Sequence, residues 1–213
     1  MSSYLAILDR GHLENSIFLT AFAKSLAKQG NRQGIIIHGD SEYTERLIQT
    51  GMMREDAKIR AAKDLNRRLV GLFADQGVAT IGVHGYQKGL VKKHDTGLEI
   101  DKVQLHSFHS IPCLLISNLV DENNKTISAT LPDLARVFSE VVNDSEVVLF
   151  SKNEKDEILV SKEKSEVKWN SLSPDFKENT LPGEFENFNH PALLTTATDF
   201  ANWPNLQKVT KMT

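Results

Sequence analysis

The sequence predicts an α/β fold, a three-layer α/β/α sandwich with a mainly parallel sheet. The apolar β-branched run Ile35–Ile37, ended by His38-Gly39-Asp40, is typical of a strand covered on both faces. Apolar residues then recur at helical spacing between positions 55 and 75, and a second strand follows at 78–83. A strand, a helical segment and another strand in this order favour parallel strands joined by crossover helices.

The flanking elements continue the same alternation. Residues 4–8 form an apolar strand that is broken at Asp9-Arg10-Gly11-His12, and a helix over 15–28 is ended by Gly30. A third buried strand covers 111–117. A helix then begins near Pro132, which is tolerated in a first helical turn, and a strand over 146–150 ends at Ser151-Lys152.

The chain changes character after residue 152. The stretch 153–168 is rich in charge, and 171–191 is polar with little periodicity. We therefore expect an α/β domain over 1–152 and a loop-rich C-terminal segment over 153–213. Trp169 and Trp203 are expected to pack this segment against the core.

Composition excludes several classes of protein. The chain has 213 residues and a net charge of −3, so no overall positive field attracts nucleic acid or a membrane surface. Its single cysteine, Cys113, cannot form a disulfide within one chain. No apolar run is long enough to span a bilayer, and a cytoplasmic protein is expected.

Several short sequence motifs occur along the chain in the same order as in one known protein family. They are Ile35–Gly39, Leu65–Val70, Gln76-Gly77, Ile81–Gly85, Gly89–Val91, Asp95–Gly97 with Asp101–Val103, and Ile111-Pro112. In this order they resemble the acetylglutamate kinases of the amino-acid kinase superfamily, over roughly residues 3 to 158. The stretch 95–103 resembles the β-hairpin of that family.

The resemblance implies phosphoryl transfer from ATP to the γ-carboxylate of N-acetylglutamate. Such chemistry depends on lysines that face the transferred group, on N–H groups of glycine turns and on bridging Mg²⁺. The position of the first family lysine is occupied by Asp9, followed by Arg10 and by Gly11-His12 in place of a glycine pair. Of the second glycine turn only Gly39 remains, with Asp40 after it.

Other family positions are also altered. Arg54 is displaced by one residue from the substrate arginine, and the asparagine–aspartate motif falls on Ser128 and Thr130. The Thr-Asp pair that opens the nucleotide lobe falls on Ser151-Lys152. A second catalytic lysine has no counterpart, and much of the nucleotide lobe is expected to be missing. The chain thus resembles a truncated, degenerate member, and we assign no catalytic residue.

Candidate binding residues remain at the strand ends. For a substrate they are Gly11, Gly39, Asp40, Arg54, Gly85, Lys88, Ser128 and Thr130, and for a nucleotide Ser151 and Lys152. The turn from His84 to Gly89 permits close backbone approach to a ligand, although an ordinary β-turn explains it equally. His38 is either a ligand contact or a structural residue at the end of its strand.

Two further patterns have simpler explanations than a site. The pair His106 and His109 has the spacing of two metal ligands, but a surface pair is the simpler interpretation and no metal site is expected. The arginines 60, 67 and 68 are either solvated or flank a dimer seam, because the family dimerises through this helix. A homodimer is therefore expected.

Three hypotheses of function follow. The first is an acetylglutamate-kinase-like protein that has lost efficient phosphoryl transfer and binds a small acidic metabolite or a protein partner. The second is an active kinase that uses Mg-ATP and relocated cations at Arg10, Lys88 or Lys152. The third is a structural subunit without a ligand. No cofactor is expected unless the second hypothesis holds.

Overall fold

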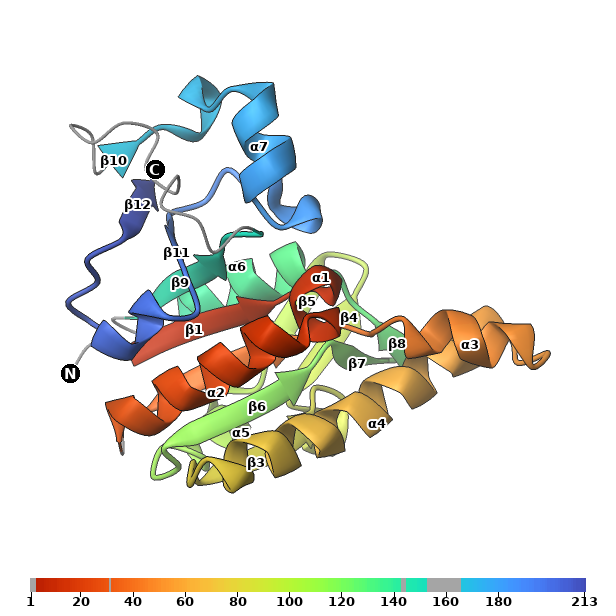
Figure 1. The fold of residues 1–213 in the computed structure, drawn as a ribbon. Coiled ribbons are helices and arrows are strands. Elements are labelled where there is room, and N and C mark those ends of the chain that lie inside the picture. Colours follow the sequence, from red (N-terminus) through yellow and green to blue (C-terminus); the bar gives the residue numbers. More distant parts are fainter. Residues whose placement is uncertain (1–2, 31, 143–144, 153–165) are drawn as a thin grey trace.

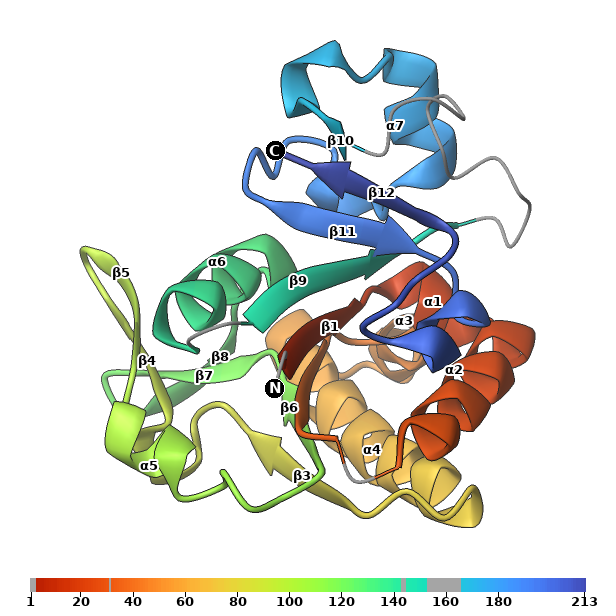
Figure 2. The same cartoon turned by 90° about the vertical axis from the view of Figure 1, so that its left-hand side faces the viewer.

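The computed structural model describes residues 3–30, 32–142, 145–152 and 166–213. Its strands form an eight-stranded sheet and a smaller four-stranded sheet, shown in Figures 1 and 2. The eight strands are β1 (Ser3–Leu8), β2 (Gly34–His38), β3 (Thr80–His84), β6 (Cys113–Ser117), β9 (Ser145–Phe150), β10 (Glu166–Val167), β11 (Ala192–Thr195) and β12 (Val209–Met212). The four are β4 (Val91–His94), β5 (Gly97–Ile100), β7 (Leu119–Glu122) and β8 (Lys125–Ser128).

The large sheet is mainly parallel, as expected. Its order is β10-β12-β11-β9-β1-β2-β6-β3, and β12 runs antiparallel to β11. The strands β1, β2, β3, β6, β9 and β11 all run in one direction, so their carboxyl ends meet at one edge. In an open α/β sheet this edge is where ligands bind. We refer to it as the carboxyl edge.

Helices cover both faces of the large sheet. The helices of the described residues are α1 (Arg10–Glu14), α2 (Ser16–Gln29), α3 (Tyr43–Gln49), α4 (Arg54–Asp75), α5 (Lys102–His106), α6 (Leu131–Val141) and α7 (Pro174–Thr180), of which α3 packs on α4 and not on the sheet. Short 3-10 turns are η1 (Gln87–Gly89), η2 (Trp169–Ser171), η3 (Gly183–Phe185) and η4 (Asp199–Asn202). The helices α2 and α4 lie on one face, while α5, α6 and the small sheet lie on the other (Figure 2).

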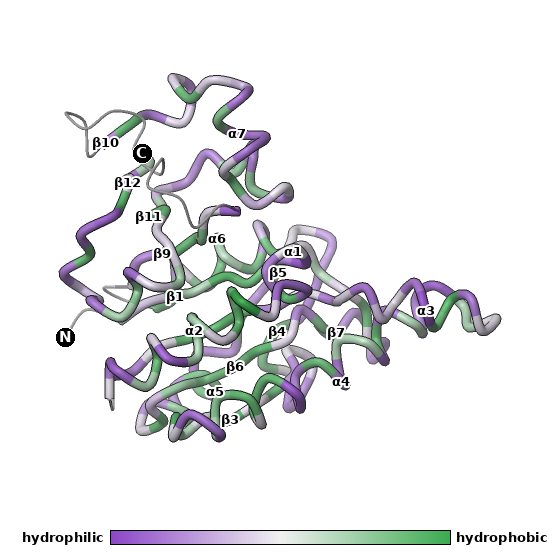
Figure 3. Tube along the Cα trace, in the orientation of Figure 1, coloured by the Kyte–Doolittle hydropathy of each residue, from purple (hydrophilic) through white to green (hydrophobic). Residues whose placement is uncertain are grey.

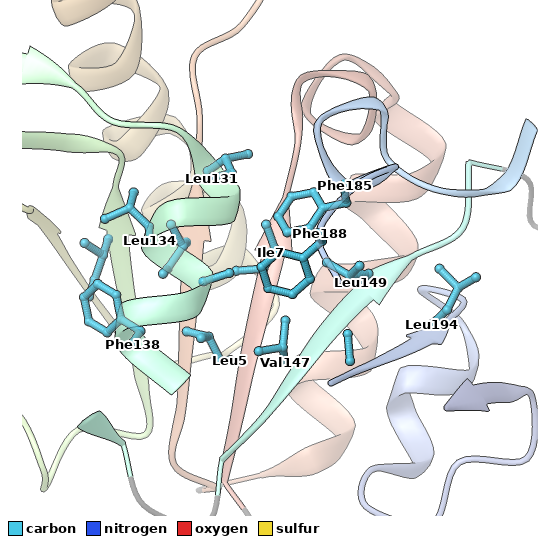
Figure 4. Close-up of a cluster of buried hydrophobic side chains, with 14 of the residues drawn as sticks. Leu5, Ile7, Leu131, Leu134, Phe138, Val147, Leu149, Phe185, Phe188 and Leu194 are labelled. Carbon is cyan, nitrogen blue, oxygen red and sulfur yellow. The ribbon is translucent and has the colours of Figure 1, made fainter. Parts of the chain in front are cut away.

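Strand alternation divides the core between these two faces. Leu5 and Ile7 of β1 face α6, where they join Leu134 and Phe138 (Figure 4). The alternating residues of β1, which include Ala6, belong to a second cluster with the aromatic residues of α2. Successive side chains of a strand point to opposite faces, so a strand buried on both sides is apolar throughout. Figure 3 shows this hydrophobic character along the central strands.

The C-terminal segment is more regular than the sequence suggested. The strand β11 pairs in parallel with β9, and β12 pairs with β11, so both extend the large sheet. The side chains Phe185 and Phe188 pack with Leu149 and Leu194 (Figure 4). The expectation of a loop-rich segment is therefore corrected for 166–213, because four-residue strands show too little periodicity to be recognised. The charged stretch 153–165 lies outside the described residues.

A second correction concerns the hairpin expected at 95–103. The hairpin itself is present as β4 and β5, paired antiparallel. Residues 101–103, however, begin α5: the Asp101 carboxylate accepts hydrogen bonds from the N–H groups of Val103 and Gln104. An aspartate at this position caps a helix and does not continue a strand. In the described part of the chain, no helix combines the length and apolarity needed to cross a membrane.

Candidate functional site at the carboxyl edge

Asp9 and His12 fill the end of β1. Asp9 is buried and is the N-cap of α1, where its Oδ1 accepts from the His12 N–H at 3.1 Å. Nδ1 of the His12 ring lies 2.6 Å from the same oxygen. Burial by itself would raise the pKa of Asp9, but the contacts with His12 and the charge of Lys152 outweigh it and lower that pKa. Asp9 is therefore a carboxylate held inside the protein.

The His12 side chain is part of the core. It is buried, its ring lies 4.3 Å from that of Phe18 between centroids, and its Nε2 lies 3.3 Å from the carbonyl oxygen of Ser151. This contact joins the end of β1 to the end of β9. The sequence-predicted pair Gly11-His12 thus forms a packed helical turn. A Cβ at Gly11 would meet the Asp9 carboxylate at an ordinary 3.6 Å, so packing does not require glycine there.

The side chain of Arg10, next to Asp9, is paired with carboxylates at the protein surface. Its Nε donates to Oε1 of Glu14 at 2.8 Å, and a terminal nitrogen lies 3.9 Å from Glu45. Arg54, the candidate substrate arginine, also pairs with Glu45 at 3.4 Å and is exposed. The two arginines therefore share one acidic partner. Both tie α1 and α4 to α3 at the surface.

Glu184 of η3, in the C-terminal segment, lies at the carboxyl edge together with the carboxylates of Asp9 and Asp40. Its Oε2 accepts from the Leu131 N–H at 3.4 Å, at the start of α6. Partial burial raises the pKa of Glu184, and the charges of Asp9 and Asp40 raise it further, against the opposing hydrogen bond from Leu131. The carboxylates of Asp9 and Asp40 thus both act on Glu184. An edge of this kind repels phosphate.

The N-termini of α2 and α6 are capped by side chains of the chain itself, whereas α3 and α4 begin without a side-chain cap. The Asn15 side chain accepts from the N–H groups of Ile17 and Phe18, and Thr130 Oγ1 accepts from Asp133. Phosphate sites in proteins use such N–H groups directly. In α2 and α6 these N–H groups already donate to side-chain oxygens.

The remaining candidates are spread along the edge. Asp40 accepts from Thr44 at 2.9 Å, and Gly39 approaches the Leu131 side chain. Lys152 Nζ donates to the Glu178 carbonyl oxygen at 2.6 Å. Ser128 ends β8, where it pairs with Leu119.

The His84–Gly89 turn lies on the far side of the sheet from β9. A Cβ at Gly85 would lie 2.6 Å from the Leu119 carbonyl oxygen, so close packing against β7 explains that glycine. Lys88 has a left-handed backbone in η1, with φ of 54°. Because β2 and β6 separate β3 from β1, the structure does not bring Lys88 to Asp9.

His38 is a structural residue of the core. It is fully buried, its Nδ1 donates to the Gly39 carbonyl oxygen at 2.8 Å, and its Nε2 accepts from Asn66 at 3.0 Å. Burial lowers the pKa of His38 to about 4, so the ring is neutral at pH 7. In the described part of the chain, no group of three or more His, Cys, Asp or Glu side chains is arranged to hold a metal ion.

Solved structures share this fold. Isopentenyl phosphate kinase matches with a TM-score of 0.66 and 12% identity, over 99% of this chain and 100% of that one. The N-acetylglutamate synthase from Neisseria gonorrhoeae matches with 0.64 and 12%, over 92% and 55%. Aspartate kinase from Synechocystis matches with 0.60 and 9%, over 100% and 40%. The chain has the amino-acid kinase fold.

The amino-acid kinase fold extends here beyond the part that the sequence resemblance covered. The match to isopentenyl phosphate kinase runs over both chains almost completely, including the segment after residue 152. The replacement of most of the nucleotide lobe by residues 153–213 stays a prediction. No family model and no curated protein matches the sequence.

The structure adds two residues that sequence reasoning did not select for the site. In the sequence His12 belongs only to the turn that ends the first strand, and Glu184 lies 53 positions from its partner Leu131. The aspartate before His12 is a local signal for a helix N-cap, which could have placed this histidine in a helical turn. No local signal could have placed Glu184 beside Asp9 and Asp40.

Proposed function

We propose that this protein has the fold of a kinase without efficient phosphoryl transfer, and that it acts by binding. The observation that carries the proposal is Asp9: where the resemblance expects a catalytic lysine, a carboxylate is held by His12 inside the protein. A cation facing the transferred phosphoryl group contributes roughly 10³–10⁵ in rate. Replacing it by an anion removes that contribution and adds repulsion.

The edge also fits Mg-ATP poorly. A triphosphate needs N–H groups and cations, whereas α1, α2 and α6 are capped by the chain's own oxygens and Arg10 is paired with Glu14. A protein partner is favoured over the acidic metabolite expected from the sequence, because Asp9, Asp40 and Glu184 would repel a second carboxylate. A role close to acetylglutamate kinase and a cytoplasmic location remain parts of this proposal.

Turnover is the decisive test. The purified chain is incubated with Mg-ATP and, in turn, N-acetylglutamate, glutamate and isopentenyl phosphate, and ADP release is measured. We expect release at least about a thousandfold below the 1–100 s⁻¹ typical of kinases. Turnover at a normal rate with any acceptor would refute the proposal. Thermal melting with the same compounds separates binding without turnover from no binding.

An active kinase with relocated cations is the second candidate, and Lys152 is the observation in its favour. Its charge reaches Asp9 and lowers the pKa of that carboxylate, so one cation lies at the carboxyl edge. If Lys152 replaces the missing lysine, Lys152→Ala removes the turnover while the exposed-lysine control Lys125→Ala retains it. If the protein is a structural subunit without a ligand, we expect neither ADP release nor a shift in thermal melting.

We also propose a homodimer that forms through α4 and β3. Among the described strands, β3 pairs only with β6, and Ile81 on it is 43% exposed. An open edge with an apolar residue is a surface that a second strand can extend. We expect light scattering to give a dimer for the unmodified chain and a monomer for Ile81→Lys. A monomer in both cases would contradict this arrangement.

A further inference from the structure

A groove opens at the opposite end of the large sheet from the carboxyl edge. It has a volume of about 440 Å³ and lies at the amino ends of β2 and β6, with Ile35 and Leu114 in its lining. Leu105 and Phe108 line it from α5 and the turn after it, and Val141 lines it from α6. Figure 2 shows α5 and α6 on the same side of the sheet. The volume is within the range of small-molecule sites.

The lining is apolar and incompletely covered. Ile35, Leu105, Phe108 and Val141 pack against the core cluster but remain only partly buried, unlike Leu114, which is buried. Each of these side chains therefore leaves apolar surface that a bound group could remove from water. Burial of such surface contributes about 25 cal/mol per Å².

The rim of the groove carries nitrogen-bearing side chains. Lys102, His106 and His109 all line it, and among the described residues that line it none is Asp or Glu. Within the described residues, the Lys102 ammonium forms no ion pair. The rings of His106 and His109 stack in parallel, 4.8 Å apart between centroids. In a chain with net charge −3, this rim is suited to an anion.

The walls of the groove are held in place by hydrogen bonds. Asp101 caps α5 through the N–H groups of Val103 and Gln104. The Gln33 side chain donates to the His109 carbonyl oxygen and so ties the start of β2 to the turn after α5. The N–H of Ile111 donates to the Phe108 carbonyl oxygen at 3.0 Å. The groove is thus formed before any ligand arrives, which reduces the cost of binding.

We propose that this groove binds a small carboxylate with an apolar body, its chain against Ile35, Leu105 and Phe108 and its carboxylate beside Lys102 and His106. The charge of the rim decides between a carboxylate and a neutral apolar molecule. This site is separate from the carboxyl edge, so it does not depend on the function proposed there.

The test uses three probes that each have a linear chain of eight carbon atoms and differ in the head group: octanoate, octanol and octylamine. Each is titrated into the full-length protein below its micelle concentration, and binding is followed by amide chemical shifts and by calorimetry. We expect octanoate to bind more tightly than octanol, octylamine to bind most weakly, and shifts to concentrate around Ile35, Leu105 and Phe108. Shifts at the carboxyl edge alone would overturn the proposal.

Variants of Lys102 sharpen the test. Reversing the charge of Lys102 removes its attraction for a carboxylate and adds repulsion, so Lys102→Glu should weaken the binding of octanoate about tenfold. Lys102→Arg should retain binding, and Lys125→Glu on β8 is the matched control. Equal affinity for octanoate and octanol in all variants would refute a carboxylate site. A change of oligomeric state in Lys102→Glu would instead identify the groove as an interface between copies and overturn the proposal.

Discussion

At the scale of single residues, the Asp9–His12 pair determines which chemical groups the end of β1 presents to a ligand. Asp9 caps α1 and is buried, while His12 packs between α2 and the end of β9. A residue kept for catalysis is usually a burden on stability, whereas a structural cap stabilises the fold. The sign of the change on substitution therefore distinguishes the two roles.

We predict that Asp9→Ala lowers the free energy of unfolding by about 1–2 kcal/mol, because the cap of α1 is lost. Asp9→Asn should cost less, since an amide oxygen can still accept from the His12 N–H. Urea denaturation measures both. A rise in stability for Asp9→Ala would show that the carboxylate is retained for function and contradict its structural role.

His38 makes stability depend on pH. Its pKa is about 4 in the folded chain and near 6.5 when unfolded, so the unfolded state binds a proton first as the pH falls. The stabilisation is complete above about pH 6.5 and is lost between there and pH 4, by about 3 kcal/mol in total. Denaturation at pH 8, 6 and 4.5 measures this loss. The variant His38→Gln should show a shallower pH dependence; an unchanged slope would contradict the assignment.

At the scale of elements, close packing fixes how neighbouring strands meet. Gly34 of β2 lies beside Tyr4 of β1 in register, and a Cβ there would lie 2.0 Å from the Tyr4 ring. That ring is itself packed edge-on against Phe200, with centroids 4.9 Å apart. The strand pair and η4 therefore form one packed unit.

Gly34→Ala should destabilise the fold by about 1–3 kcal/mol, as expected for overpacking. Gly71→Ala is the matched control, because Gly71 lies inside α4 with no atom within 4 Å of its added Cβ. That substitution should stabilise the chain by about 0.5–1 kcal/mol through helix propensity. Thermal and urea denaturation of both variants test the pair. A neutral Gly34→Ala would mean that Tyr4 can move away without cost.

The sequence predicted the long elements well and the short ones poorly. The apolar runs that became β1, β2, β6 and β9, and the periodicity of α2, α4 and α6, were sufficient to recognise them. The helices α1 and α5 were missed because each has only five residues, too few to show helical periodicity. The site was predicted only in part: strand ends can be located from a sequence, whereas the approach of Glu184 to Leu131 depends on tertiary packing.

At the scale of the whole molecule, the C-terminal segment is joined to both faces of the sheet. Trp169 lies in the cluster beneath α6, and its Nε1 donates to the His190 carbonyl oxygen at 2.8 Å. Trp203 lies in the cluster beneath α2, beside Tyr4. The two tryptophans thus report on opposite sides of one sheet.

We predict that Trp169→Phe and Trp203→Phe, each with one remaining tryptophan, unfold in urea at fluorescence midpoints that coincide with the circular dichroism midpoint of the same variant. Shared burial across the sheet should make unfolding cooperative. Separate midpoints for fluorescence and circular dichroism would indicate that the segment after residue 152 unfolds as an independent unit. That division stays a prediction until this measurement.

The position of β1 between β2 and β9 also has a consequence for biosynthesis. As the chain leaves the ribosome, β1 can pair with β2 early, but its other edge stays open until Ser145–Phe150 has been made. During that interval the nascent chain exposes an apolar strand edge that can join other chains. Chaperone binding during translation is therefore expected to matter most before β9 emerges.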